Sequence, residues 1–585
     1  MTTYFTSHVE SERHYLGLEK KLEIGRKQWG VECPSASEQP HLLLIRLNLS
    51  PQGKSVDDKP DLDVVRNGLM RLCCLFERIY KGDKLIDELG KDGQLRPKHL
   101  VNDYKFSATL GFGIGFFDML KISKENRPRH IRGMPDHNGL GDPTPYSLAQ
   151  TDLIIQIASK VDHINGWVLE NTVQSLNQDD DANLGDLRDC PDGVELRPTE
   201  RCCPDGQIVN KEEKCTPDII SAIEGWATVV DVHAGFQRLD GRNLMGFNDG
   251  VSNPRPHSGA PFNDVVWTTR EDEGNRLKDG TYMVYQKIEH DLHQWRQLSL
   301  EQQERWVGRK KNTGLLLGTL SDDEEKKLGM NLRSTKSRIR EDAAKKLKAW
   351  LDKQKDPSTR LYDDNKYKNA VPAWSHIRKA NPREELIDKT KGDAKGRIGQ
   401  HLIFRRGYMF VEDDENSDFR SGLQFICFQK NIENGFEFIK KNWLNNQNFP
   451  VPISGPALRR TFTERELIER HKHGRLTGRE LIEIKYDMSK RKLLGLGADG
   501  DFNKALRQSG YNLTSHSGQP VKDQVGNQII ANTQNTGREG LAGPSELGVS
   551  PTGQILTIIP MGGGYYFVPP IPEKGVKYIG QQFFA

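Results

Sequence analysis

The order of the apolar segments in the first 160 residues restricts the fold more than any other feature of this sequence. Residues 41–50 (HLLLIRLNLS) are a continuous apolar run typical of a buried strand. Residues 61–82 carry apolar side chains at helical spacing and end at Gly82, which suits a helix C-terminus. Residues 106–120 and 151–159 are again strand-like. Strand, helix, strand, strand is the order of a split β-α-β unit, so we predict a ferredoxin-like antiparallel sheet.

The rest of the chain repeats this strand-rich pattern between polar insertions. Four apolar segments should form a second sheet, in a lobe like the first: residues 282–288, 401–410, 422–429 and 562–572. The insertions are a Cys-rich loop at about 172–217, a charged helical excursion at about 321–369 and a basic segment at about 456–500. The predicted domains are a polar N-terminal extension (1–39), an N-terminal lobe (40–240) and a C-terminal lobe (241–575).

The charge balance restricts the function classes. The 585 residues include 84 Lys plus Arg and 81 Asp plus Glu, for a net charge of +3, which argues against a dedicated nucleic-acid or membrane-surface protein. No apolar stretch approaches the roughly 18 residues of a membrane helix, and the first residues show neither a signal-peptide core nor a twin arginine. Eight Cys are too few for a disulfide framework. We therefore expect a soluble cytoplasmic protein.

Two short motifs in the insertions match known ligand loops only in part. The segment GLGADG (495–500) has the spacing of a dinucleotide-binding turn, but KRKLL precedes it where a buried strand is required. Asp179, Asp181 and Asn183 copy the start of a calcium loop, yet Leu184 and Cys190 replace the required Gly and Glu. An exposed turn and a solvated acidic loop are the preferred interpretations.

The Cys-rich and basic insertions leave further alternatives open. Four cysteines could supply thiolates to a structural zinc ion, although they lack short C-x-x-C hairpins; free thiols or a local disulfide are the alternatives: Cys190, Cys202, Cys203 and Cys215. The basic stretch 458–492 could follow a phosphate backbone, but glutamates are interleaved with its cations, which favours a solvated helical face.

Three segments place an unusual polar group in an apolar or Gly/Pro-shaped context. In LMGFNDGVSNP (244–254), glycines on either side allow a tight backbone around Asp249. In PAWSHIRKANPRE (372–384), His376 lies between Trp374 and Ile377. In HLIFRRGYMF (401–410), strand alternation turns one of two adjacent arginines toward the core, where a buried cation needs an anionic partner. Taken singly, a turn Asp, a satisfied His and an edge Arg pair are the preferred explanations.

Together, these segments resemble the dye-decolorising peroxidase family of haem enzymes. The family signature G-x-x-D-G appears as GFNDG (246–250). The resemblance extends, in the family's order over roughly residues 41–572, through FSATLGFGIGFF, DLIIQIAS, QERWVGRKKNTG, SHIRKANPR, IFRRGY, GLQFICFQ and GGGYYFVPP. It implies an α+β fold of two ferredoxin-like lobes with antiparallel sheets, of the dimeric α+β barrel type. It also implies one haem b per chain, held in the C-terminal lobe.

The resemblance also implies residue roles. His376 corresponds to the axial iron ligand, Asp249 to the distal acid–base group, and Arg405, rather than Arg406, to the distal arginine. Leu423 and Phe425 match the apolar wall of the distal face. Arg378 and Arg383 are candidates for the haem propionates because their charge is complementary. Glu433 or Glu437 would be suited to hydrogen-bond the axial histidine.

The implied activity is reduction of hydrogen peroxide to water, with one-electron oxidation of phenolic or dye-type donors. Trp374, Tyr408 and Trp443 could carry oxidising equivalents to large donors at the surface, or could simply pack in the core. The alternative function is a haem-handling protein, binding haem or extracting its iron, with little peroxidase turnover. A non-haem interaction protein is a third interpretation. The sequence leaves open a homo-oligomer and the physiological reductant, and it predicts no nucleic-acid or membrane partner.

Overall fold

The computed structural model of this chain describes most of the two predicted lobes. The described residues are 27–32, 38–50, 60–81, 85–89, 94–142, 145–170, 218–238, 242–247, 253–254, 260–292, 295, 298–311, 313–318, 322–332, 334–353, 371–372, 375–382, 400–413, 419–446, 558–571 and 578–584. The Cys-rich and basic insertions fall outside them. The hypotheses of zinc, calcium, a dinucleotide turn and a phosphate-binding stretch therefore stay predictions.

The first half of the chain forms four antiparallel strands in the ferredoxin-like order. These are β1 (His41–Leu49), β4 (Ser107–Gly113), β5 (Leu153–Ser159) and β6 (Ala227–Phe236). They pair in the order β4-β5-β1-β6, with every pairing antiparallel. The first strand thus lies between the third and the fourth, as a split β-α-β unit requires.

The second half repeats that order. Its strands are β7 (Thr281–His290), β9 (Tyr408–Asp413), β10 (Phe419–Gln429) and β11 (Ile558–Val568), in the order β9-β10-β7-β11, and the short β8 (Phe404–Arg405) also pairs with β10. All pairings are antiparallel. The prediction of an α+β fold built from two ferredoxin-like units is confirmed.

The two sets of strands join into one nine-stranded sheet rather than two separate sheets. β6 meets β9 at Phe236 and Met409, and β11 meets β4 at Tyr566 and Gly113. Because β7 also pairs with β10, the sheet closes on itself. Joining the halves in this way pairs strands that would otherwise be open edges.

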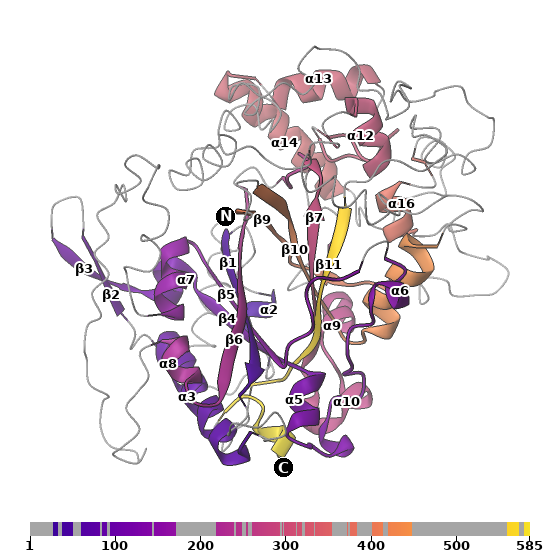
Figure 1. Ribbon diagram of the computed structural model, residues 1–585. Coiled ribbons are helices and arrows are strands. Elements are labelled where there is room, and N and C mark those ends of the chain that lie inside the picture. Colours follow the sequence, from indigo (N-terminus) through magenta and orange to yellow (C-terminus); the bar gives the residue numbers. More distant parts are fainter. Residues whose placement is uncertain are drawn as a thin grey trace.

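Most helices cover the outer face of the closed sheet (Figure 1), whereas α2 and α9 contribute to the core on its inner face. In the first half the helices are α2 (Trp29–Glu32), α3 (Leu62–Lys81), α4 (Leu100–Tyr104), α5 (Ile114–Met119), η1 (Lys124–Asn126), α6 (His137–Leu140), α7 (Asp162–Leu169) and α8 (Ile219–Ile223), with a hairpin of β2 (Leu85–Leu89) and β3 (Leu95–His99). In the second half they are α9 (Ala260–Val266), α10 (Arg270–Leu277), α12 (Leu300–Val307), α13 (Asp322–Leu332), α14 (Ser337–Lys353), α16 (His376–Ala380), the π-helical η3 (Glu433–Glu437) and η4 (Ile439–Leu444), and η5 (Gln581–Phe584).

Two apolar cores lie on opposite faces of the sheet. The inner cluster joins side chains from strands of both halves, including Leu44, Met283, Ile426 and Tyr566. The outer cluster packs the helices against the alternate side chains of the same strands, such as Cys427. Along β10, residues 424, 426 and 428 therefore face inward, and residues 423, 425 and 427 face outward.

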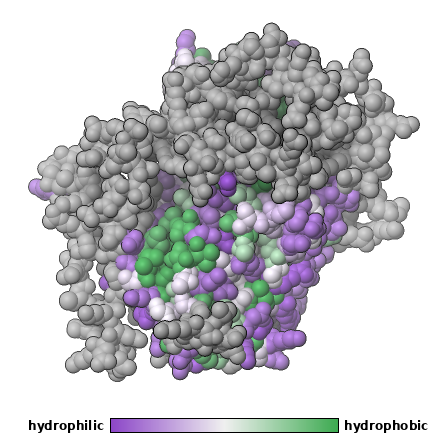
Figure 2. Space-filling view, in the orientation of Figure 1, coloured by the Kyte–Doolittle hydropathy of each residue, from purple (hydrophilic) through white to green (hydrophobic). Residues whose placement is uncertain are grey.

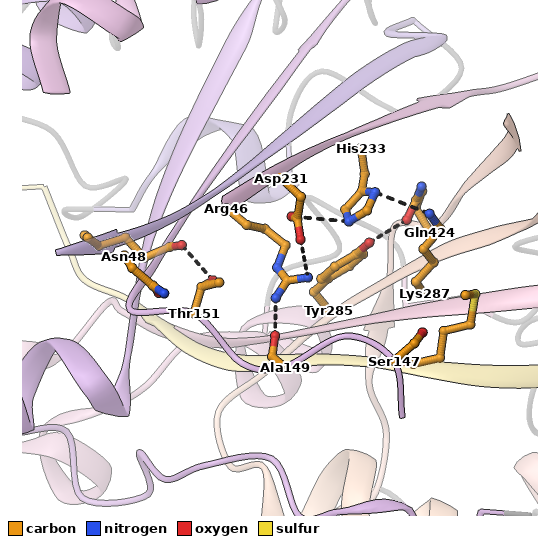
Figure 3. Close-up of polar contacts among 12 residues, drawn as sticks. Arg46, Asn48, Ser147, Ala149, Thr151, Asp231, His233, Tyr285, Lys287 and Gln424 are labelled. Atoms are coloured by element: carbon orange, nitrogen blue, oxygen red, sulfur yellow. Dashed lines mark hydrogen bonds and ion pairs between the residues drawn. The ribbon is translucent and has the colours of Figure 1, made fainter. Parts of the chain in front are cut away.

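A polar cluster bridges the halves where β6 and β9 have a single strand pairing (Figure 3). Asp231 lies 3.1 Å from Arg46 and 3.3 Å from His233, while Lys287 lies 2.5 Å from Glu412 and 3.3 Å from His233. Burial alone would raise the pKa of Asp231 and of Glu412, but the close approach of His233 and of the nearby cations lowers the pKa of both. The cluster thus supplies contacts between the halves that the strand ladder does not.

One segment differs from the sequence-based expectation. The predicted strand 106–120 ends at Gly113 and continues as α5, where a Cβ on Gly115 would lie 2.0 Å from the carboxylate of Asp152. In the described part of the polar N-terminal extension, Gln28 and Gln39 are buried. Gln28 donates to carbonyl oxygens of β4 and of the segment after β11. The charged excursion after residue 321 is helical and largely exposed in α13 and α14, as predicted.

Strand β6 carries an exposed apolar surface (Figure 2), where Val229, Val230 and Val232 are 37–48% exposed. Apolar patches on a protein surface often mark contacts with other chains. This face is where the homo-oligomer left open by the sequence would be sought first.

In the described part of the chain, no helix is both long enough and apolar enough to cross a bilayer.

Candidate functional site

The start of the signature segment is anchored on the loop that follows α12. Phe247 is buried with its ring 6.2 Å from that of Trp295. Gly246 has a φ of +88°, and a Cβ there would lie 2.5 Å from the side chain of Lys311. Only glycine meets both requirements without strain. The Arg242 guanidinium also donates to the Gly246 carbonyl at 2.8 Å, so the backbone entering the signature is fixed.

The segment 244–254, which contains the signature, is anchored on β8 near its C-terminal end. The side-chain amide of Asn253 donates to the carbonyl oxygen of Arg405 at 2.7 Å, and its oxygen accepts from the Arg405 N–H at 2.9 Å. Asp249 itself lies outside the described residues, between these two anchors in the sequence. Sequence reasoning missed the Asn253 contact, because a side-chain amide that completes a strand edge 152 residues away has no local signal.

Arg405, Leu423 and Phe425 share the outer face of the second half-sheet. Arg405 is opposite Cys427 in the β8–β10 ladder, and Leu423 and Phe425 alternate with inward residues on β10. Burial raises the pKa of the Cys427 thiol far above its usual range, while the charge of Arg405, which is opposite Cys427 in the ladder, opposes that rise. Arg405, Leu423 and Phe425 are each half-buried. The face is therefore an apolar surface with a cation at its edge.

Arg406 is the inward-facing member of the arginine pair. Its side chain is 3% exposed and donates to the backbone oxygen of Val31 and the side-chain oxygen of Gln39. The sequence predicted one arginine in the core and an anionic partner for it. Alternation is confirmed, but these two hydrogen bonds go to neutral oxygens of the N-terminal segment. Arg406 therefore contributes to the packing of that segment.

His376 is the first residue of α16, and the helix is held from several sides. Arg378 is buried and donates to the carbonyl oxygen of Val371, while Ile377 packs against an apolar cluster that includes Val371. At the C-terminus of α12, a Cβ on Gly308 would lie 2.7 Å from Ile377, so glycine permits the close approach of the two helices. The imidazole of His376 remains half-buried.

The two glutamates considered as partners of the axial histidine lie on η3. Glu433 and Glu437 pair with Arg132 at 2.9 and 2.6 Å. Their carboxylates thus contact a cation from the first half of the chain. Arg383, the second candidate for the propionates, lies outside the described residues. The part of the chain that the structure describes contains no cluster of three or more His, Cys, Asp or Glu side chains suited to a metal ion.

The aromatic residues considered for electron transfer have interior positions where they are described. Tyr408 is fully buried on the inner face, and burial raises the pKa of its phenol. Trp443 is also buried, beside the stacked rings of His401 and Phe438. These positions favour core packing over a surface relay for both residues. Trp374 lies outside the described residues.

Two sequence profiles of the Dyp-type peroxidase family match this chain: the N-terminal domain over residues 55–180 and the C-terminal domain over residues 240–449. Together they cover more than half of the sequence. The chain therefore belongs to the Dyp-type peroxidase family, which confirms the resemblance.

The curated relatives and solved structures that resemble this chain have low sequence identity to it. Deferrochelatases from Escherichia coli (strain 536) and Yersinia pestis are each 27% identical over 218 residues, which is 36% of this chain and 41% and 40% of the relatives. The chain thus aligns with about two fifths of their length. A DyP-type peroxidase from Cellulomonas bogoriensis is 16% identical, with 96% of each chain covered and a TM-score of 0.46. A Rhodococcus jostii DypB variant, solved in complex with heme, is 18% identical, with 71% of this chain and 87% of that chain covered and a TM-score of 0.39.

Proposed function

We propose that this chain is a haem b peroxidase that reduces hydrogen peroxide to water and oxidises phenolic or dye-type donors in one-electron steps. Family membership supports the class of enzyme. The observation that carries the proposal is the paired hydrogen bond between Asn253 and the Arg405 backbone. It joins Asn253, four residues after Asp249 in the sequence, to the strand containing Arg405. Asp249 and Arg405 are the two residues that the chemistry needs on one side of a haem.

The residues present fit such a cofactor. A haem needs an apolar surface for its ring, a nitrogen donor for iron and cations for its two carboxylates. Leu423 and Phe425 offer a half-buried apolar face, and His376 offers a half-buried imidazole. The η3–η4 segment contacts both the apolar face and the helix of His376. Phe436 of η3 lies 5.9 Å from Phe425, and Lys379 of α16 donates to the carbonyl oxygen of Asn446, just after η4. When bound, haem would supply an iron centre that activates peroxide and stores its oxidising equivalents.

His376 would hold the iron through a neutral imidazole nitrogen, which is a strong donor to haem iron. Arg378 and Arg383 are proposed for the propionates. Arg378 already donates to the Val371 carbonyl, so a propionate would share its guanidinium with the backbone. The five donors of a guanidinium permit that sharing.

Asp249 and Arg405 would act on the peroxide. Asp249 takes a proton from one peroxide oxygen and returns it to the other, which leaves as water. The reference pKa of an Asp side chain is about 3.9, so near neutral pH the carboxylate is ionised and can accept the first proton. It is seldom in the protonated form that returns the proton, so we expect the rate with peroxide to be highest at acidic pH. Arg405 keeps its charge and stabilises negative charge on the leaving oxygen, by about 3 kcal/mol in a water-poor site.

A haem-handling role with little peroxidase turnover is the alternative, favoured by the printed name of the deferrochelatase relatives. Such a protein would need His376 but not the pairing of Asp249 with Arg405. An ultraviolet–visible spectrum of the purified, haem-loaded protein, taken before and after one equivalent of peroxide, separates the two. The peroxidase proposal predicts a rapid change of the Soret band that a phenolic donor reverses. Slow bleaching with release of iron would favour the alternative.

A further inference from the structure

A strap from the first half of the chain, residues 130–142, contacts the π-helical segment of the second half. In Figure 1, α6 lies beside this segment, next to α16. Arg132 joins Glu433 and Glu437, at 2.9 and 2.6 Å, and therefore spans one turn of η3. Asp142 pairs with Lys440 of η4 at 2.6 Å. The strap is thus fixed to both π-helical elements by ion pairs.

The Asp142–Lys440 pair is deeply buried, with side chains that are 0% and 7% exposed. Further polar partners offset the cost of removing both charges from water. Gln286 accepts from the Lys440 ammonium at 2.5 Å, and the Tyr146 hydroxyl donates to the same carboxylate oxygen of Asp142. The ammonium also lies 5.4 Å from the ring centre of Phe436. A buried pair with these partners holds a defined position.

A short series of contacts continues from the strap to the His376 helix. Asn445 donates to the Leu140 carbonyl and lies 3.4 Å from an Asp142 carboxylate oxygen. The next residue, Asn446, accepts through its carbonyl from the Lys379 ammonium at 2.6 Å. Lys379 is fully buried and lies three residues after the histidine on α16. The strap therefore contacts one residue at the end of η4, and α16 contacts the next.

Helix α16 depends on such contacts because it has only five residues. Helices this short are unstable without tertiary packing. Wide π-turns like those of η3 and η4 are also rare, and they occur frequently at functional sites. The position of His376 is consequently determined by the neighbours of α16 rather than by its own helical hydrogen bonds.

We propose that the strap sets the position of the axial ligand and that Asp142 is a positioning residue for His376. The inference rests on the proposed function, because it takes His376 as the iron ligand. Asp142 holds Lys440 and Asn445 in place through its ion pair and its contact with the Asn445 amide. The carbonyl of Asn446, just after η4, in turn holds Lys379 of α16. The first half of the chain thereby controls how firmly the second half retains haem.

Two variants test the contacts between the strap and the end of η4 at different points. Asp142→Asn leaves the side-chain shape but removes the charge opposite Lys440. Asn445→Ala breaks the neighbouring link without leaving a buried charge unpaired, so it remains informative if Asp142→Asn folds poorly. Asp118→Asn is the matched control, since it removes the same charge from a surface pair with Arg127 within the first half. Asp142→Glu restores the charge.

Hydrogen exchange of the full-length, haem-free protein gives the first measurement. Both test variants should exchange at least about tenfold faster in peptides covering 433–446 and 375–382, and the Asp118→Asn control should not. Transfer of haem to apomyoglobin gives the second. Haem should leave both variants about five- to tenfold faster than the wild type, and Asp142→Glu should recover much of the difference.

Two results would overturn the positioning role. One is unchanged exchange of 375–382 in variants whose 433–446 peptides exchange faster. The other is unchanged haem transfer in variants whose α16 has become more mobile. Failure of the proposed function is detected separately, as a Soret spectrum of His376→Ala that matches the wild type. The two failures are therefore distinguishable.

Discussion

Asn253 binds the backbone of Arg405 as a neighbouring strand would, with its amide donating at 2.7 Å and its oxygen accepting at 2.9 Å. β8 pairs with β10 at the end of the sheet order, so Asn253 satisfies backbone groups on the edge of a two-residue strand. Asn253 lies four residues after Asp249 in the sequence, and this contact joins Asn253 to the strand that carries Arg405, the proposed distal arginine.

Replacing Asn253 tests whether that contact matters for chemistry. Asn253→Ala should retain haem, because neither the apolar face nor His376 changes. It should slow the reaction with peroxide by about 10- to 100-fold, since a displaced acid–base group loses much of its contribution. Stopped-flow mixing with peroxide measures the rate. Asn102→Ala, on an exposed position of the first half, is the control, and equal rates for the two variants would show that the contact has no catalytic role.

Arg406 should matter for stability rather than for catalysis. Arg406→Leu removes one buried donor from the backbone oxygen of Val31 and one from the side-chain oxygen of Gln39, so the free energy of unfolding should fall by about 2–4 kcal/mol. The rate with peroxide should change little, because the side chain faces away from the Arg405 surface. Urea denaturation measures the difference in stability. Arg338→Leu, at an exposed position on α14, should be nearly neutral, and equal stabilities of the two variants would contradict the prediction.

Glu273 should make stability depend on pH. It accepts from the Tyr282 hydroxyl at 2.5 Å, and burial raises its pKa above the usual range despite that hydrogen bond. A raised pKa means that the folded state favours the protonated acid. The stabilising contribution is therefore complete below the unfolded pKa of about 4.3 and is lost as pH rises through the folded value.

Glu273→Gln removes this titration, so the slope of melting temperature against pH between about pH 4 and pH 7 should become more positive than in the wild type. Thermal unfolding at closely spaced pH values measures the slopes. Glu271→Gln, at an exposed position on the same helix, should keep the wild-type slope. Parallel curves for wild type and Glu273→Gln would contradict the prediction.

The axial-ligand assignment predicts a difference between two histidines. His376→Ala should lose haem or hold it weakly with a shifted Soret band, because its imidazole is the proposed donor. His401→Ala should keep haem, although its stacking on Phe438 at 3.6 Å makes some loss of stability expected. Haem content and the Soret maximum after reconstitution measure both. An unchanged spectrum for His376→Ala would remove it from the role.

Most of the strands could be predicted because their apolar runs are local signals. The segment 41–50 became β1, and 422–429 became part of β10. Periodicity could not show how the halves join into one closed sheet, because the β6–β9 and β11–β4 pairings involve only one or two residue pairs. Only the family resemblance implied a barrel. The end of β4 at Gly113 was also missed, since the approach of Gly115 to Asp152 is tertiary.

The candidate site, like the fold, could be predicted from the sequence only in part. Strand alternation separated Arg405 from Arg406, and the family resemblance distinguished their roles. The contacts that position the site were not predictable: Asn253 reaches Arg405, and Asp142 reaches Lys440, from distant parts of the sequence. Such contacts depend on how the elements meet in the folded chain, which neither periodicity nor motif spacing encodes.

The reaction of two variants with hydrogen peroxide tests the central claim most directly. Haem-loaded Asp249→Asn and Arg405→Leu, mixed with peroxide in a stopped-flow instrument, should each show a Soret change slowed by about 10²- to 10⁴-fold, as expected when an acid–base group or a stabilising charge is lost. Arg405→Leu should be at least as slow as Asp249→Asn, because water can substitute for a carboxylate but not for a fixed cation. Wild-type rates in both variants would contradict the assignment of this site as the place where peroxide is cleaved.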